Sequence, residues 1–147
     1  MGRAEFSGRN DPLTEKIIGV FYEVYNELGF GFLESVYREA MLIALREAGL
    51  KVEAEVPVPV SFRGVLVGMF RADLVVDGRV VVELKTAESL ARRMRPQVLH
   101  YLRASVMEVG LVMNFGPGAS FRRIELQNLR KKRISADAPQ LSQGVGR

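Results

Sequence analysis

The chain contains no cysteine, and this absence removes several kinds of chemistry at once. Disulfide bridges, zinc sites built on thiolates and a cysteine nucleophile are all excluded. Histidine is almost as scarce, with 1 residue in 147. Any catalysis must therefore use oxygen and nitrogen groups.

Long hydrophobic runs are also missing. The purely apolar runs reach about five or six residues, far short of the roughly 20 that a helix needs to span a bilayer. The sequence begins MGRAEFSGRNDP, which contains no apolar segment of the kind that a secretory signal requires. We therefore expect no membrane segment and a location in the cytoplasm.

Length and composition predict one domain. A chain of 147 residues with 48% hydrophobic content fits a single globular unit with one ordinary core. Residues 1–9 and 134–147 are polar, small and aperiodic, and we expect them to be disordered tails. The domain is thus expected to occupy residues 10–133.

The formal net charge is +4, and much of the basic charge lies in three clusters. Guanidinium groups match phosphate oxygens, and their binding to nucleic acid releases condensed counterions. The clusters suit a nucleic-acid partner, and a solvated basic surface is the alternative explanation. They are Arg92, Arg93 and Arg95; Arg122 and Arg123; and Arg130, Lys131, Lys132 and Arg133.

Two amphipathic helices are expected before any strand. Apolar residues recur at three- and four-residue steps over residues 13–28, after a cap at Asn10 or Asp11 and before Gly29. The pattern returns over residues 33–48 and ends at Gly49, which is well placed as a C-cap.

Strands are expected next, because the sequence changes to alternating apolar and polar residues and becomes rich in β-branched residues. Strands are predicted over residues 52–60, 65–76 and 79–86, then a helix from Pro96 to about residue 105, then strands over 108–115 and 121–126. Pro57 and Pro59 remove two ladder donors, so the first strand should lie at an edge or be irregular. The predicted order is ααβββαββ, an α/β (α+β) fold.

The hairpin RADLVVDGRVVVELKT carries charged residues on both of its strands. Arg71 and Asp73 share one face of its first strand, and Glu83 lies on the charged face of its second. A two-residue turn would place Asp73 opposite Val82 and join a charged face to an apolar one. A three-residue connection with a bulge at Gly78 or its neighbour shifts the register by one residue. We predict this bulged register, with Asp73 on the face of Glu83 and every apolar residue on the other face.

In that register, Asp73, Glu83 and Lys85 share one wall of the sheet. Two carboxylates close together repel each other unless a cation lies between them, and Mg²⁺ or Mn²⁺ is the usual partner when a phosphate is bound. Lys85 can hold and acidify a water, or stabilise charge on the attacked phosphorus. An ordinary cross-strand ladder of salt bridges is the alternative explanation of the same three residues.

Gly31, Glu34 and Tyr37 spell GxxExxY in GFLESVY, and the motifs RADL and NFG follow at residues 71–74 and 114–116. With these motifs, the chain from about residue 13 to residue 126 resembles the GxxExxY family of prokaryotic proteins, which is placed within the PD-(D/E)XK nuclease superfamily. Asp73 followed by Glu83-Leu84-Lys85 looks like the D…ExK signature of that superfamily. The resemblance implies a restriction-endonuclease-like core, in which helices flank a mixed central sheet.

The resemblance also implies residue roles. Asp73 and Glu83 would bind the metal with help from the Leu84 carbonyl, and Lys85 would be the catalytic lysine. Glu34 corresponds to an acidic residue that many members place on the first core helix as a further ligand. The residues expected to support the site are Gly31, Tyr37, Arg71 and Tyr101, with Tyr37 as a packing residue at its rim.

Gln97 and Tyr101 are four residues apart and resemble the QxxxY element of RecB-like members. Gln97 could orient a water or touch the substrate backbone. The preceding residues depart from the family, because Met94-Arg95-Pro96 stand where HEA would be expected. The arginines found there could grip phosphate instead.

Together these features predict a nuclease that uses Mg²⁺ (or Mn²⁺) to hydrolyse phosphodiester bonds in DNA or RNA. Low sequence specificity is expected, because the sequence displays neither a recognition helix nor an aromatic stacking platform. Two alternatives stay open. One is an inactive nucleic-acid-binding module with the same fold, and the other is a protein-interaction module whose sheet edge forms a homodimer.

Overall fold

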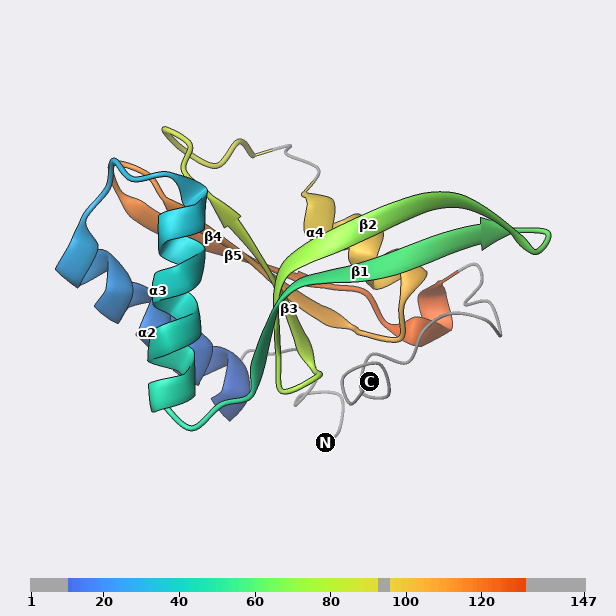
Figure 1. Cartoon of the computed structure of the whole chain (residues 1–147), viewed down its shortest axis with the longest axis horizontal. Helices are drawn as coiled ribbons and strands as arrows, with labels where there is room; N and C mark the ends of the chain where they lie inside the picture. The colour runs from blue at the N-terminus through green and yellow to red at the C-terminus, as the bar shows by residue number, and fades with distance from the viewer. Residues whose placement is uncertain (1–10, 93–95, 132–147) are drawn as a thin grey trace.

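The computed structural model describes residues 11–92 and 96–131 (Figure 1). The expected tails lie outside these ranges, as do Arg93, Arg95, Lys132 and Arg133. Helices and strands follow the predicted order, with a short 3-10 helix added at the end. Their bounds are α2 (Pro12–Leu28), α3 (Glu34–Glu47), β1 (Val52–Phe62), β2 (Val65–Val76), β3 (Val80–Lys85), α4 (Gln97–Ala104), β4 (Val109–Phe115), β5 (Ala119–Glu125) and η1 (Asn128–Arg130).

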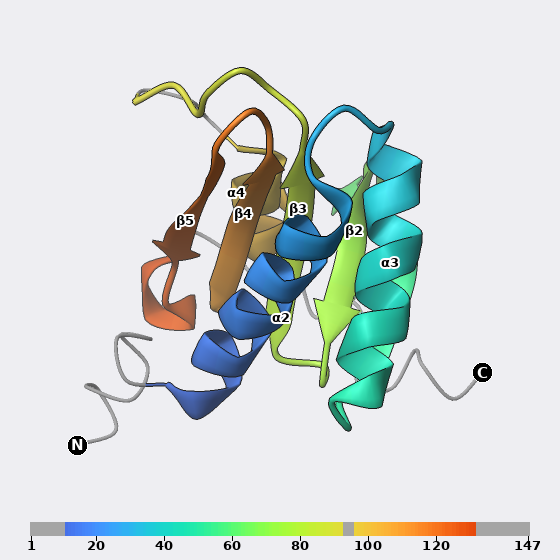
Figure 2. The same ribbon diagram turned by 90° about the vertical axis from the view of Figure 1, so that its left-hand side faces the viewer.

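The five strands form one mixed sheet in the order β1-β2-β3-β4-β5. Neighbouring strands are antiparallel except β3 and β4, which are parallel. A parallel pair needs a crossover, and α4 supplies it on one face of the sheet. Helices α2 and α3 cover the other face, as Figure 2 shows. This is the α+β arrangement of helices around a mixed sheet that the sequence predicts.

Each face of the sheet has its own apolar cluster. On the side of α2 and α3, Phe21 and Leu45 pack with Leu74 and Val82. On the side of α4, Val98 and Leu102 pack with Val75 and Val81. Strands β3 and β4 are buried on both faces, which explains their nearly continuous apolar sequences.

The first helix begins and ends where its sequence predicts. The Asp11 carboxylate caps α2 by accepting hydrogen bonds from the Leu13 amide and the Thr14 hydroxyl, so the cap is Asp11 rather than Asn10. Gly29 ends the helix with a left-handed backbone, at φ 72°. None of the helices in the described ranges is long and apolar enough to cross a membrane.

The turn between β2 and β3 has the bulged register that the sequence predicts. Val76 pairs with Val80 and Leu74 pairs with Val82, so three residues connect the strands. Asp77 and Gly78 both have positive φ, at 53° and 63°. Continuing the register by one step places Asp73 opposite Glu83.

Asp73 itself lies at a bend of β2. The residue facing it on β1, Glu55, has a left-handed backbone at φ 52°, and the ladder skips this pair. Leu74 packs in the cluster beneath α2 and α3, whereas Ala72 packs in the cluster beneath α4. Residues two apart share a face in a regular strand, so β2 rotates about its axis at Asp73.

The prediction that every apolar residue of the hairpin lies on the face away from Asp73 and Glu83 is therefore wrong. Val75 and Val81 lie on the same side of the sheet as Glu83, where α4 buries them. Alternation along a strand cannot reveal this, because it does not show that a later helix covers the charged face. On the side of the sheet that Glu83 faces, part of the surface is therefore buried beneath α4 and part is left open as a cleft.

Beyond the bend, β1 and β2 leave the body of the molecule as a two-stranded arm, residues 56–70 (Figure 1). β1 is an edge strand, as Pro57 and Pro59 predict. At the far end of the arm several apolar side chains are exposed. They are Phe62, Val65, Leu66, Val67 and Met69.

Candidate functional site

One cleft of about 210 Å³ collects most of the residues that the sequence predicts for a site. It lies where the first turn of α3, the bend of β2, the end of β3 and the first turn of α4 meet. The predicted residues that line it are Glu34, Arg71, Asp73, Glu83, Leu84, Lys85, Gln97 and Tyr101.

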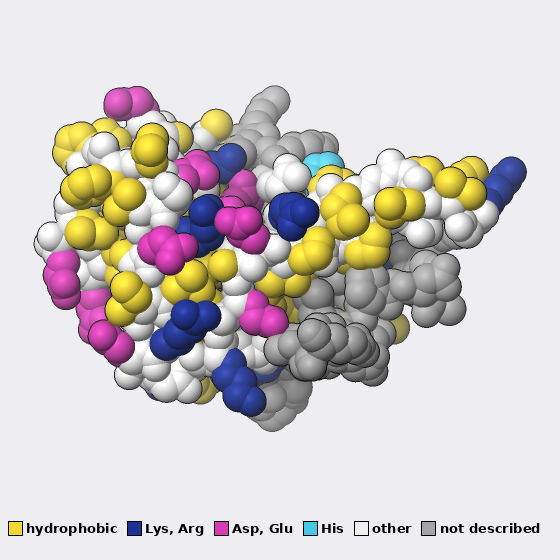
Figure 3. All heavy atoms as spheres, in the orientation of Figure 1, with side chains coloured by type: hydrophobic (Ala, Val, Ile, Leu, Met, Phe, Trp, Pro, Cys, Tyr) yellow, Lys and Arg dark blue, Asp and Glu magenta, His cyan; other side chains and the backbone are white. Residues whose placement is uncertain are grey.

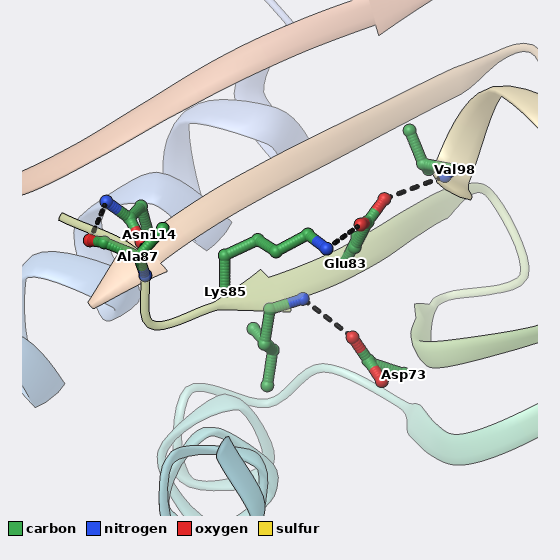
Figure 4. Close-up of polar contacts among 7 residues, drawn as sticks. Asp73, Glu83, Lys85, Ala87, Val98 and Asn114 are labelled. Atoms are coloured by element: carbon green, nitrogen blue, oxygen red, sulfur yellow. Dashed lines mark hydrogen bonds and ion pairs between the residues drawn. The ribbon is translucent and has the colours of Figure 1, made fainter. Parts of the chain in front are cut away.

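Glu83 is buried and has both carboxylate oxygens engaged. One oxygen accepts a hydrogen bond of 2.8 Å from the Val98 amide at the first turn of α4, and the other lies 3.2 Å from the Lys85 ammonium. Figure 4 shows the lysine side chain running back along β3 to meet the carboxylate. The sequence places Glu83 and Lys85 two residues apart so that both leave the same side of the strand.

Asp73 reaches across from β2 to the backbone of β3. Its carboxylate accepts a 2.7 Å hydrogen bond from the Leu84 amide, at the position where a ladder bond would otherwise form. Burial raises the pKa of Asp73, and the Leu84 hydrogen bond and the nearby Arg38 oppose that rise. The Leu84 hydrogen bond thus fixes this carboxylate near Glu83, but the positive charges around it do not fully offset the cost of burying its negative charge.

Glu34 opens α3 and faces the same cleft. Burial raises the pKa of Glu34, and the neighbouring Asp73 carboxylate raises it further, while Lys85 lowers it. Three carboxylates therefore share one cleft and repel one another. A bound cation would relieve that repulsion.

The donor atoms fit a hard divalent cation in kind, because they are carboxylate oxygens with a backbone carbonyl at Leu84. In residues 11–92 and 96–131, however, no three histidine or acidic side chains form a group arranged to hold a metal ion. Both oxygens of Glu83 are held by other groups, one by the Val98 amide and one by the Lys85 ammonium. The residues fit a metal by chemistry, and Glu83 would have to give up one of these contacts to bind it.

Gln97 and Tyr101 both reach the cleft from α4, as their four-residue spacing predicts. Gln97 is exposed, whereas Tyr101 is almost completely buried. Among the described residues the Tyr101 hydroxyl has no hydrogen-bond partner. Burial raises the pKa of Tyr101, so this group stays a neutral donor at the floor of the cleft.

Gly31 and Tyr37 do not line the cleft, and their role is to shape the α2–α3 loop, residues 29–33. Gly31 has φ 115°, a conformation that side chains disfavour. The buried Tyr37 hydroxyl donates to the Gly29 carbonyl at 2.6 Å and accepts from the Phe32 amide at 3.3 Å. Tyr37 is fully buried, and the supporting role of both residues at the site stays a prediction.

The basic clusters do not form one surface. Arg122 and Arg123 are adjacent on β5, so their side chains leave opposite faces of the sheet. Arg122 donates to the Ala91 carbonyl, and Arg92 is exposed in the same segment. Arg93 and Arg95 lie outside the described residues.

Lys131 has a structural role. Its ammonium donates to the Ser105 and Met107 carbonyls at 2.8 and 2.7 Å. Burial lowers the pKa of Lys131 to about 8, and Glu108 opposes the shift. Of its cluster, Lys132 and Arg133 lie outside the described residues.

Two residues near the site escaped the sequence analysis. Arg38, one turn after Glu34 on α3, pairs with Glu55 at 3.1 Å and opposes the rise in pKa that burial causes at both Glu34 and Asp73. Its position four residues after Glu34, on the same face of a helix, is the sequence signal that could have identified it. Asn114, the first residue of the NFG motif, bonds the Ala87 amide and carbonyl at 2.8 and 3.0 Å and so holds the segment after Lys85 (Figure 4).

The sequence profile of a family described as the PD-(D/E)XK nuclease superfamily matches residues 11–125. No curated protein is significantly similar in sequence. A solved structure described as the crystal structure of SSO0001 is similar, with 18% identity and a TM-score of 0.45, over 64% of this chain and 50% of that chain. This chain thus spans half the length of that structure, and a similarity this weak supports no inference about function. The profile match includes Glu34, Asp73, Glu83 and Lys85, and it shows that this chain belongs to the PD-(D/E)XK nuclease superfamily.

Proposed function

We propose that this chain is a nuclease that hydrolyses phosphodiester bonds with the help of a divalent metal ion, with Asp73, Glu83 and Lys85 at its reaction centre. Superfamily membership suggests the reaction class. The observation that carries the assignment is the cleft itself, which these residues line together with Glu34. The motif GxxExxY further supports assignment to the GxxExxY family.

Glu34, Asp73 and Glu83, with the Leu84 carbonyl, are the groups that would hold Mg²⁺ (or Mn²⁺). When bound, such an ion polarises a phosphate oxygen and makes a water molecule more acidic. Burial raises the pKa of Glu34 and repulsion from Asp73 raises it further; that repulsion supports this role, because a cation in the cleft would relieve it.

Lys85 would supply the cationic charge that a reacting phosphate needs. Its ammonium lies 3.2 Å from the Glu83 carboxylate, and the residue lines the cleft. Lys85 would direct its positive charge at the phosphate or at the attacking water. Gln97, exposed at the rim, would orient that water or contact the substrate backbone.

The substrate would be DNA or RNA, held through its phosphates with low sequence specificity. Arg71 lines the cleft, and the exposed Arg92 lies shortly before the start of α4 in the sequence. Arg122 and Arg123, with Arg93 and Arg95, are the further cations proposed to contact phosphate. Location in the cytoplasm stays a prediction from the sequence.

The test is a cleavage assay with single- and double-stranded DNA and RNA, in Mg²⁺, in Mn²⁺ and with a chelator. The chain should cleave at least one substrate only when metal is present. Lys85→Ala should lower the rate by about 100-fold or more, the scale of losing a positioned catalytic group. Lys16→Ala, an exposed lysine of α2, is the matched control and should cleave normally.

Equal cleavage by the Lys85→Ala variant and the unaltered chain would overturn the proposed reaction centre. Binding of nucleic acid without cleavage in either metal would favour the inactive binding module instead. Thermal melting of each variant establishes that it is folded.

A homodimer is a second proposal, and the arm supports it. Residues 56–70 carry a single charged residue, Arg63, and their exposed apolar side chains offer little for phosphate. A second copy of the same neutral, apolar arm is the partner that we propose.

A further inference from the structure

The α2–α3 loop displays large apolar side chains beside the cleft. Phe30 and Leu33 are 59% and 75% exposed, and Phe32 and Val36 are also open to solvent. Figure 3 shows hydrophobic side chains gathered over this loop, on the same face as the acidic and basic side chains around the cleft. Contiguous apolar groups on a surface generally mark a binding site.

The loop is held rigidly in this exposed form. Tyr37 bonds both the Gly29 carbonyl and the Phe32 amide, and its ring stacks on Phe115 with centroids 4.2 Å apart. Gly29 and Gly31 adopt the positive φ values that the turn requires. The Phe32 ring packs edge-on against Tyr37 with centroids 6.1 Å apart, which leaves Phe30 and Leu33 facing solvent, and a loop fixed in this way loses little entropy when it binds.

The loop is continuous with the cleft. Leu33 is the residue immediately before Glu34, and Glu34 lines the cleft with Asp73 and Lys85. The Tyr25 hydroxyl, near the end of α2, donates to the Gly116 and Pro117 carbonyls and ties this end of the helix to the β4–β5 turn. A strand of nucleic acid whose phosphate lies in the cleft would therefore place a neighbouring nucleotide against the loop.

The chemistry of the loop suits bases rather than phosphates. Residues 17–37 contain no lysine or arginine, and they include three glutamates. Phosphate oxygens thus find no cation there, whereas aromatic rings stack on base faces. In a duplex those faces are already covered by the neighbouring base pairs.

We propose that residues 29–33 form a stacking platform for unpaired bases, so that the substrate class of this cleft is nucleic acid with single-stranded nucleotides beside the reacting phosphate. This inference rests on the proposed function for the phosphate position. It differs from the expectation, drawn from the sequence, that the chain displays no aromatic stacking platform. The proposal also gives the three residues of the GxxExxY motif related roles. Gly31 and Tyr37 shape the platform, and Glu34 lies where the platform meets the cleft.

The test measures binding in the Lys85→Ala background with Mg²⁺, so that probes stay intact. The probes are a fluorescent oligo-dT and a blunt-ended hairpin duplex of similar charge. Phe30→Ala should weaken oligo-dT binding by about tenfold and leave duplex binding within about twofold. Ile43→Ala, which removes an equally exposed (59%) apolar side chain from α3, is the matched control and should change neither.

A second variant gives a direct signal. The chain contains no tryptophan, so Phe30→Trp introduces a single fluorescent ring at the platform. This variant should bind oligo-dT as its parent does, and its fluorescence should fall on binding because the indole stacks on a base. Unchanged fluorescence at saturating oligo-dT would overturn the proposal.

Other results also decide the question. Equal effects of Phe30→Ala and Ile43→Ala on binding, or a change in oligomeric state on Phe30→Ala, would overturn the platform. If the chain with Lys85 cleaves every substrate independently of Phe30, the platform fails and the nuclease stands. If it cleaves nothing but binds oligo-dT through Phe30, the nuclease fails and the platform stands.

Discussion

At the residue scale, Asn114 connects two segments that meet at the end of β3. Its side chain is completely buried, and it bonds both the amide and the carbonyl of Ala87. Gly116 leaves room for the same segment, since a Cβ there would lie 2.0 Å from the Ala87 oxygen. The two residues together fix the backbone that follows Lys85, so Asn114 is a positioning residue for the site.

We predict that Asn114→Ala lowers the free energy of unfolding by about 1–3 kcal/mol, because both Ala87 groups lose their partner. The Ala87 amide should exchange its hydrogen faster, and cleavage should fall by more than the loss of folded protein explains. Chemical denaturation and hydrogen exchange measure the first two effects. Asn26→Ala, at an exposed position of α2, is the control and should be close to neutral. Slow exchange at Ala87 in the variant would contradict the positioning role.

At the scale of elements, α4 sits close to the sheet because β4 carries a glycine beneath it. An ideal Cβ at Gly110 would lie 2.5 Å from a Val98 methyl group. The Val98 amide is also the group that holds Glu83. The distance between α4 and β4 therefore sets the position of a carboxylate in the cleft.

Gly110→Ala should destabilise the chain by about 1–3 kcal/mol, the usual cost of overpacking a core. The added methyl group should push the first turn of α4 outward and lower cleavage through Glu83. Adding Val98→Ala should restore part of the stability, which urea denaturation measures. Gly19→Ala is the matched control, because nothing lies within 4 Å of its Cβ and alanine favours a helix. A Gly110→Ala variant as stable as the original chain would rule out this close packing.

At the scale of the whole molecule, the far end of the arm is the part that the two cores do not explain, because Val58 near its base is buried in the cluster beneath α4 whereas the side chains at the far end are exposed. Pro57 and Pro59 lie on β1, where they remove donors from the edge and hinder the addition of a further strand. The proposed homodimer would use the faces of the arm, where Val65, Val67 and Met69 are exposed. Because residues 56–70 include one charged residue, two copies can pack there with little repulsion.

We predict that light scattering at tens of micromolar gives a mass of twice 16.4 kDa for the unaltered chain. Val67→Lys should give a monomer, because its exposed position on the arm would place two like charges in the contact. Ile43→Lys, at a similarly exposed position on α3, should stay dimeric. A monomeric unaltered chain, or a dimeric Val67→Lys variant, would contradict the homodimer.

The sequence by itself determined the elements, their order and the register of one hairpin. Local signals were sufficient there, since capping at Asp11, glycines after both helices and prolines on β1 act within a few residues. The register followed from the same kind of argument, because only a three-residue turn brings Asp73 to the side of Glu83. The resemblance to the superfamily added Glu34 to the predicted site. No local sequence pattern indicates that this residue lies near the hairpin.

Tertiary structure alone decided how the site is enclosed. The rotation of β2 at Asp73 depends on Glu55 across the ladder, and the burial of Val75 and Val81 depends on α4, which comes later in the chain. Three further contacts join residues that lie 5 to 27 positions apart in the sequence. They are the contacts of Glu83 with Val98, of Asn114 with Ala87 and of Tyr37 with the exposed loop. Periodicity reports only which side of its own element a residue faces, so the partner on that side is set by packing.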